Sequence, residues 1–224
     1  MYQLPINIQI DDHFYTKNPE SSELGKKIVS ESIIMMDDMG FESFTFKKLG
    51  KQIGSNESSV YTYFESKHML LVYLICWYWS WVSYRIVFKT NNINESEQRL
   101  TKAIAIITGK VTEDISFSYI NEILLQNIII SESSKAYHTK EVDEENAKGY
   151  FRAYKAVVQR VSEMVLEVNS SYAYPHMLVS TVIEGAHQQR YFSEHLPSLT
   201  DTTLEADSVV QFYTDLVLQT IKAS

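Results

Sequence analysis

Residues 44–71 read FTFKKLGKQIGSNESSVYTYFESKHMLL, and this stretch decides the fold of the 224-residue chain. Thr45 can cap a short helix that stops at Gly54, and Asn56 can cap a second short helix. Ser66 can then cap a much longer one. Two helices of about eight residues, joined by a glycine-containing turn, are typical of a helix-turn-helix, whose second helix lies in the major groove of DNA.

Helical patterns continue on both sides of this stretch. An amphipathic helix is expected to run from Ser22 to a stop at Gly40, and Met69–Phe88 predicts a central helix that other helices cover. Seven Gly and four Pro are too few for the turns of an all-β protein. The sequence predicts an all-α fold of about nine helices. The remaining helices are expected at 95–114, 119–132, 143–168, 175–194 and 204–222.

Charge and apolar runs limit the partners of the protein. The formal net charge of −8 argues against a globally basic nucleic-acid coat and a polybasic membrane binder. Between Thr45 and Lys67, four lysines and two glutamates nevertheless leave a local net charge of +2, where DNA binding needs it. The longest apolar run, Met69–Trp79, is shorter than the roughly 18 to 20 residues that span a bilayer. Together with a single cysteine, Cys76, these features predict a cytoplasmic protein without a membrane partner.

The second short helix has a face suited to DNA. At 100° per residue, Ser58 and Thr62 lie opposite Val60, which marks the direction of the core. Ser59 and Tyr61 flank them. The exposed arc is therefore small, uncharged and rich in hydroxyl groups, which suits close approach to base edges and phosphates.

A specific series of residues runs through this region: Gly40-Phe41, Thr45, Leu49, Gly54 and Val60-Tyr61-x-Tyr63-Phe64-x-x-Lys67, followed by Leu70-Leu71. The series, within Ile28–Leu71, resembles the DNA-binding domain of the tetracycline-repressor (TetR) family of bacterial transcriptional regulators. The resemblance implies a homodimeric repressor that binds a palindromic operator in double-stranded DNA and responds to a small effector. It also implies that DNA is contacted by Thr45, Lys47, Ser58, Ser59, Tyr61, Thr62, Tyr63 and Lys67.

Two residues depart from the family pattern. Ser55 stands where an apolar residue normally packs onto Val60, so the turn loses that contact. Glu57 lies in the first turn of the second helix, where its charge favours the helix dipole but repels phosphate. Its functional interpretation is recognition of a cytosine amino group, and the simpler one is N-terminal capping, which we prefer.

By this resemblance the chain divides into an arm at 1–21 of unknown role, a helix-turn-helix domain at 22–67, and a helical ligand-binding and dimerisation domain at 68–224. Asp11 and Asp12 argue against an arm that enters a DNA groove. In the arm, apolar residues alternate with polar ones as in a β-strand: Leu4, Ile6, Ile8 and Ile10.

The larger domain is rich in aromatic residues, which line small-molecule pockets between helices but also fill ordinary cores. We expect a small apolar or aromatic effector and no cofactor. In similar proteins the pocket lies among the central helices, and the corresponding residues here are Trp81, Phe117, Tyr154 and His187.

The last two helices carry apolar residues at helical spacing, with Gly185 small enough for a close approach. In the resembled family this pair of helices forms the dimer interface, although packing within one chain would use the same pattern. Effector binding would alter the spacing of the two DNA-reading helices through the central helix at 67–88. The residues expected at the interface are Val179, Ile183, Ala186, Phe212, Tyr213 and Leu216.

Two alternatives remain. Helical bundles also hold di-iron sites built from Glu-x-x-His motifs, and Glu65-x-x-His68 and Glu184-x-x-His187 match that spacing. Two such motifs are unremarkable by chance, and no catalytic residues or metal ligands are predicted. The other alternative is a helical interaction module that keeps the shape of a DNA-binding head without binding DNA.

Overall fold

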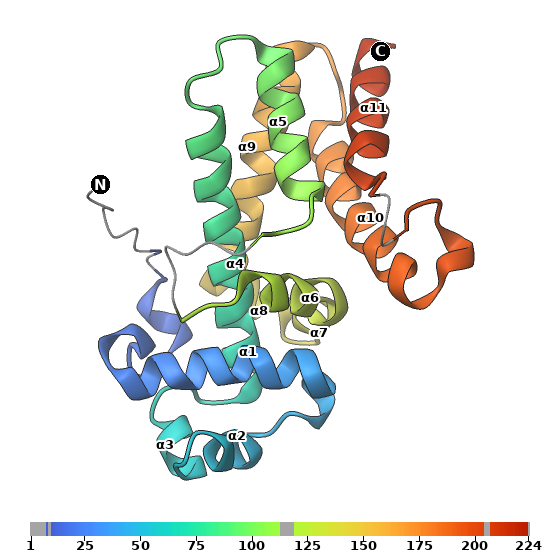
Figure 1. The fold of residues 1–224 in the computed structure, drawn as a ribbon. Coiled ribbons are helices and arrows are strands. Elements are labelled where there is room, and N and C mark those ends of the chain that lie inside the picture. The colour runs from blue at the N-terminus through green and yellow to red at the C-terminus, as the bar shows by residue number, and fades with distance from the viewer. Residues whose placement is uncertain (1–7, 9, 113–118, 204–206, 224) are drawn as a thin grey trace, which may run out of the picture. The chain divides into compact units, whose positions relative to one another are not determined.

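The computed structural model describes residues 8, 10–112, 119–203 and 207–223. These residues form eleven α-helices and three short 3-10 helices, and they contain no β-strand (Figure 1). The all-α prediction is confirmed, with two more helices than the nine expected.

The chain divides into two compact units. Unit 1 comprises Met1–Tyr78 and Val111–Phe151, and unit 2 comprises Trp79–Lys110 and Arg152–Ser224. The long helix α4 (Lys67–Thr90) begins in unit 1 and ends in unit 2. Unit 1 therefore extends beyond the expected 22–67 head, because the later helix α6 packs along α1.

Unit 1 contains the expected helix-turn-helix. Side-chain caps form where the sequence predicts them: Thr45 Oγ1 accepts from the N–H of Lys48 over 3.2 Å, and Asn56 Oδ1 accepts from the N–H of Ser59 over 2.9 Å. Gly40, the expected stop, lies inside α1 at φ +74°, where the helix kinks. The helices that lie wholly in this unit are α1 (Glu23–Ser43), α2 (Phe46–Gln52), α3 (Glu57–Tyr61), α6 (Glu122–Glu132), α7 (Ser134–Tyr137) and α8 (Val142–Lys148).

The described part of the arm is not a strand. It forms two 3-10 turns, η1 (Asp12–Phe14) and η2 (Pro19–Ser21). Phe14 and Pro19 are buried, so these turns are anchored to unit 1. The expected alternation depended in part on Leu4 and Ile6, which lie outside the described residues.

Unit 2 is built from α5 (Ser96–Thr108), α9 (Arg152–Val168), α10 (Pro175–His195) and α11 (Val209–Lys222), with η3 (Pro197–Leu199) after α10. Helix α9 packs against α5 and α10, and α11 packs against the same two helices (Figure 1). The single helix expected at 143–168 is wrong. The chain breaks after α8 because Gly149 adopts φ +90°, a left-handed conformation that ends a helix.

Helix α4 is the one described helix that is long and apolar enough to cross a membrane by length and composition. Of its most apolar 18-residue window, 72% is buried within the structure. Trp77 and Trp81 are almost completely buried. This burial is typical of a core helix, as the sequence predicts for Met69–Phe88.

Candidate functional site

The turn between α2 and α3 brings the two helices close together. A Cβ atom on Gly50 would lie 2.8 Å from the backbone carbon of Asn56, so only glycine allows this approach. The N–H of Ser55 donates to the carbonyl of Gly50 over 2.8 Å. The turn is thus held by a backbone hydrogen bond although Ser55 lacks an apolar side chain. Glu57 is exposed in the first turn of α3, whereas Asn56 caps that helix.

Helix α3 presents the expected polar face. Val60 is completely buried, whereas Ser58 and Thr62 are exposed and Ser59 is half-buried. The Ser58 and Ser59 hydroxyls donate to Asn56 Oδ1 over 2.7 and 2.9 Å, which fixes their positions. The helix has five residues rather than eight, since the chain tightens into a turn after Tyr61.

Tyr61 combines a fixed ring with an open hydroxyl. Its ring packs edge-on against Phe46, with the two centroids 4.9 Å apart. The side chain remains 49% exposed, and its hydroxyl has no hydrogen-bond partner among the described residues. The geometry therefore leaves a rigid donor at the surface, as a phosphate contact requires.

Tyr63 does not join this surface, contrary to the prediction. The residue is 2% exposed, and its hydroxyl lies 2.7 Å from Ser22 Oγ. The hydrogen bond from Ser22 lowers the pKa of Tyr63, and Lys17 Nζ lies 5.0 Å from the ring centroid. The ring faces the core because Tyr63 follows Val60 by three residues, nearly one helical turn. Tyr63 thus anchors the arm to the head.

Two lysines of the Thr45–Lys67 stretch are engaged by α1, and one of them, Lys67, was expected to contact DNA. Lys67 Nζ donates to the carbonyls of Phe41 and Glu42 over 3.0 and 3.2 Å. Lys48 Nζ donates to the carbonyl of Ser43 over 2.7 Å. Both ammonium groups therefore satisfy the carbonyl end of α1, where positive charge is favourable.

The other two lysines of the Thr45–Lys67 stretch are open. Lys47 and Lys51 are exposed on α2, and neither forms an ion pair with a described carboxylate. Thr45 is exposed beside them, although its hydroxyl already caps α2. The surface formed by Thr45, Lys47, Lys51, Ser58, Tyr61 and Thr62 is called the reading face below.

In unit 2, two of the four expected effector residues meet around a third aromatic ring. Tyr154 stacks on Trp79 with the centroids 4.5 Å apart, and the His187 ring lies 6.0 Å from Trp79. The Tyr154 hydroxyl donates to Glu184 Oε1 over 2.7 Å. His187 is buried, and its Nε2 has no hydrogen-bond partner among the described residues. Burial, aided by the charge of Arg190, lowers the pKa of His187 to about 4.

Trp81, a third expected effector residue, is not part of this cluster. Trp81 is 1% exposed, and the Arg85 guanidinium lies 4.6 Å from its ring centroid. Residues two positions apart in a helix point about 200° apart, so Trp79 and Trp81 lie on different faces of α4. Phe117 lies outside the described residues. Sequence reasoning missed Trp79, because α4 is apolar on nearly every face and no periodicity distinguishes one ring from another.

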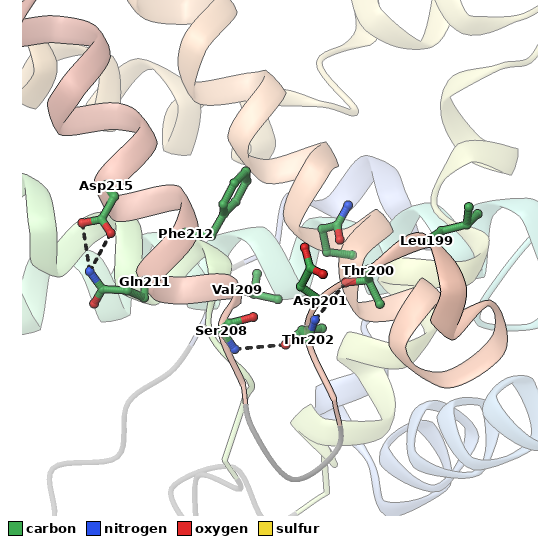
Figure 2. Close-up of a pocket in the computed structure, with 10 residues that line it drawn as sticks. Leu199, Thr200, Asp201, Thr202, Ser208, Val209, Gln211, Phe212 and Asp215 are labelled. Carbon is green, nitrogen blue, oxygen red and sulfur yellow. Dashed lines mark hydrogen bonds between the residues drawn. The ribbon is translucent and has the colours of Figure 1, made fainter.

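A cavity of about 450 Å³ lies elsewhere in unit 2, between the segment that follows α10 and the first turns of α11 (Figure 2). Gln211 donates to both carboxylate oxygens of Asp215 over 2.9 Å, and the N–H of Ser208 donates to Thr202 Oγ1 over 3.0 Å. Of the expected effector residues that the structure describes, Trp81, Tyr154 and His187, none lines it. Its lining consists of Gln189, Leu199, Thr200, Asp201, Thr202, Ser208, Val209, Gln211, Phe212 and Asp215.

The expected dimer residues divide into two sets. Val179, Ile183 and Ala186 are completely buried within the chain, and Tyr213 is 6% exposed. The Tyr213 hydroxyl occupies the space beside Gly185, 2.3 Å from where a Cβ atom would stand. The prediction is wrong for these four residues, which pack α10 against α11 within one chain.

Phe212 and Leu216 form the other set. They are 56% and 38% exposed and lie about one turn apart on α11, to one side of its buried face. This pair is called the α11 outer face below. It is available to a second chain without any rearrangement of the core.

The two Glu-x-x-His motifs have other partners. His68 Nε2 lies 2.6 Å from Glu145 Oε1, and Glu184 accepts from Tyr154. Among the described residues, no group of three or more His, Cys, Asp or Glu side chains is arranged to hold a metal ion. The di-iron alternative therefore gains no support from these motifs.

Comparisons with known proteins support the fold. No family model matches this sequence, and no curated protein sequence matches it. A solved structure of the fatty acid degradation regulator FadR from Bacillus halodurans is 14% identical, with a TM-score of 0.61 over 86% of this chain and 93% of that one. AibR in complex with isovaleryl coenzyme A and operator DNA is 13% identical, with a TM-score of 0.59 over 85% of this chain and 97% of that one. The chain shares their fold.

Proposed function

We propose that the protein is a DNA-binding transcription regulator of the TetR type, acting in the cytoplasm as a ligand-responsive homodimer, and not an enzyme. The observation that carries this proposal is the reading face. Exposed Lys47 and Lys51 supply positive charge for phosphates, and the hydroxyl-bearing surface of α3 suits base edges. The rigid Tyr61 ring adds an oriented donor.

The homodimer would form through the α11 outer face. Phe212 and Leu216 are apolar and exposed, and large apolar side chains gathered on one helix mark an interaction surface. A two-fold pairing of such faces would present two copies of α3 to a palindromic operator.

The effector would bind in unit 2, near the cluster of Trp79, Tyr154 and His187. This cluster joins two aromatic rings, a neutral buried imidazole and a hydroxyl, a composition that suits an apolar or aromatic molecule with one polar group. AibR was solved with isovaleryl coenzyme A and operator DNA, so a short acyl thioester is the first effector to test. Binding would alter DNA affinity by shifting populations through α4, which runs from unit 1 into unit 2.

The decisive experiment is fluorescence anisotropy of the full chain against duplex DNA from the upstream region of its own gene, at two salt concentrations. We expect sequence-selective binding that weakens with salt and with Lys47→Ala or Tyr61→Phe. Lys102→Ala on α5 is the matched control, since it removes the same charge from an exposed site in unit 2. Non-selective binding that Lys102→Ala weakens as much as Lys47→Ala would favour the interaction module instead.

A further inference from the structure

A second cavity, of about 390 Å³, lies in unit 1 beside the arm. Its size falls within the range of small-molecule sites. It does not include the reading face or the residues expected to bind the effector. The lining residues that matter are three carboxylates, Asp11, Asp12 and Glu20, and two tyrosines, Tyr15 and Tyr73.

The cavity is strongly negative. Among the residues that the structure describes, no lysine, arginine or histidine lines it, and neither Asp12 nor Glu20 forms an ion pair with a basic side chain. The nearby Lys17 lies over the ring of Tyr63 instead. The pKa of Tyr15 is raised, by burial first and then by the charges of Asp12, Glu20 and Asp11. A cation in this cavity would relieve the repulsion among these groups.

Tyr73, which lines the cavity, also carries a buried hydroxyl without a partner among the described residues. Tyr73 is 1% exposed, and its hydroxyl has no hydrogen-bond partner among the described residues. Leaving such a group unpaired is costly, so its partner is expected to come from a bound molecule. The Tyr15 and Tyr73 rings lie edge-to-face, with their centroids 6.3 Å apart, and aromatic rings attract organic cations.

We propose that this cavity binds an aliphatic polyamine, such as spermidine. Several ammonium groups separated by methylene chains match carboxylates that are spread around a cavity with aromatic walls. A metal ion fits less well, because no group of three possible ligands among the described residues is arranged to hold one. The Tyr73 hydroxyl oxygen would accept a hydrogen bond from an ammonium group of the ligand, and Asp12 and Glu20 would pair with the ligand's charges.

The site is tied to the DNA-binding head. The N–H of Thr16 donates to the carbonyl of Tyr63 over 2.8 Å, and the Tyr63 hydroxyl meets Ser22. Glu20 itself accepts from the Tyr119 hydroxyl over 2.7 Å. A ligand that orders the arm would therefore also stabilise the segment that follows α3.

Isothermal titration calorimetry of the full chain with spermidine tests the proposal, with magnesium chloride titrated in parallel. We expect saturable binding of spermidine that Asp12→Asn and Glu20→Gln each weaken by about tenfold or more. Tyr73→Phe keeps the ring and should weaken binding by at least about threefold. Glu23→Gln, which removes the same charge from an exposed site in α1 outside the cavity, should bind as the wild type does.

Two outcomes would overturn the proposal. If Glu23→Gln weakens binding as much as Asp12→Asn, spermidine is held only by the overall negative charge. If magnesium binds as tightly and displaces spermidine, the site is a cation site without preference for an amine. Asp12 is exposed, so Asp12→Asn should leave the thermal unfolding midpoint unchanged and remain informative even if Tyr73→Phe folds poorly. Neither outcome depends on DNA binding, so failure here would leave the proposed function intact.

Discussion

The carboxylate of Glu132, at the end of α6, accepts the backbone N–H of Phe41 over 3.1 Å, although 91 positions separate the two residues. The backbone carbonyl of Phe41 accepts a hydrogen bond from Lys67 Nζ, at the start of α4. The kinked end of α1 is thus held on one side by α6 and on the other by α4. Because α2 and α3 follow directly, these bonds help to set the position of the reading face.

Glu132→Ala should lower the free energy of unfolding by about 1 to 3 kcal/mol, because it leaves a buried N–H without a partner. Urea denaturation followed by circular dichroism measures the loss. Glu42→Ala is the control. The Glu42 side chain is exposed and its Oε1 lies 3.4 Å from Lys135 Nζ, which also pairs with Glu132. Its removal should therefore cost less than about 1 kcal/mol. Equal losses in the two variants would contradict the role given to the Phe41 hydrogen bond.

The sequence predicted those features of the fold that depend on residues close together in the chain. The caps at Thr45 and Asn56 each require only a side chain and an N–H three residues later, so their pattern is visible in one dimension. Val60 was correctly placed in the core, because its direction follows from helical geometry.

Longer-range relationships were not visible. Nothing local to Glu132 signals that it binds Phe41, and nothing in the Tyr61-x-Tyr63 pattern shows which residue holds the Tyr63 hydroxyl. The spacing from Val60 turns the Tyr63 ring inward, but its hydrogen-bond partner, Ser22, comes from the start of α1. Val179 and its neighbours show the same difficulty, since a pattern of apolar residues does not say which chain covers them.

Tyr63→Phe should lower stability, whereas Tyr61→Phe should lower DNA affinity. Tyr63→Phe removes a part-buried hydrogen bond to Ser22 and should lower the free energy of unfolding by about 1 kcal/mol. Tyr61→Phe removes an exposed hydroxyl, so stability should change by less than about 0.5 kcal/mol while operator affinity falls. Thermal unfolding and fluorescence anisotropy distinguish the two. A stability loss in Tyr61→Phe, or a pure affinity loss in Tyr63→Phe, would contradict these assignments.

The salt dependence of DNA binding should separate Lys47 from Lys48. An open lysine that contacts phosphate releases a counterion, so Lys47→Ala should reduce the slope of log affinity against log salt by roughly 0.9 per contact. Lys48 is engaged with the carbonyl of Ser43, so Lys48→Ala should leave the slope unchanged and cost a fraction of a kcal/mol, about 0.5, in stability. Equal slopes for the wild type and Lys47→Ala would show that Lys47 does not contact a phosphate.

Dimerisation should depend on the α11 outer face. Replacing Phe212 and Leu216 together by Ser removes two exposed apolar side chains, so the dimer should dissociate at concentrations where the wild type is paired. Sedimentation velocity measures the shift. Ile34→Ser removes an equally exposed apolar side chain, 46% accessible, from α1 and serves as the control. A double variant that stays dimeric would place the interface elsewhere.

Stability should fall on mild acidification because of His187. Its pKa is about 4 in the folded chain and about 6.5 when unfolded, so the unfolded state binds more protons between these values. The stabilising contribution is present above pH 6.5 and is lost as the pH falls toward 4. Between pH 7.5 and pH 5, we expect a loss of roughly 2 kcal/mol from this group.

Denaturant unfolding of wild type and His187→Gln at both pH values isolates this contribution. Glutamine does not titrate, so the variant should lose less stability than the wild type on acidification, whatever its stability at pH 7.5. His195→Gln, at the exposed end of the same helix, should keep the wild-type difference between the two pH values. If His187→Gln and the wild type lose equal stability, the imidazole must gain a proton without penalty, and the cluster with Trp79 would have to be open to water.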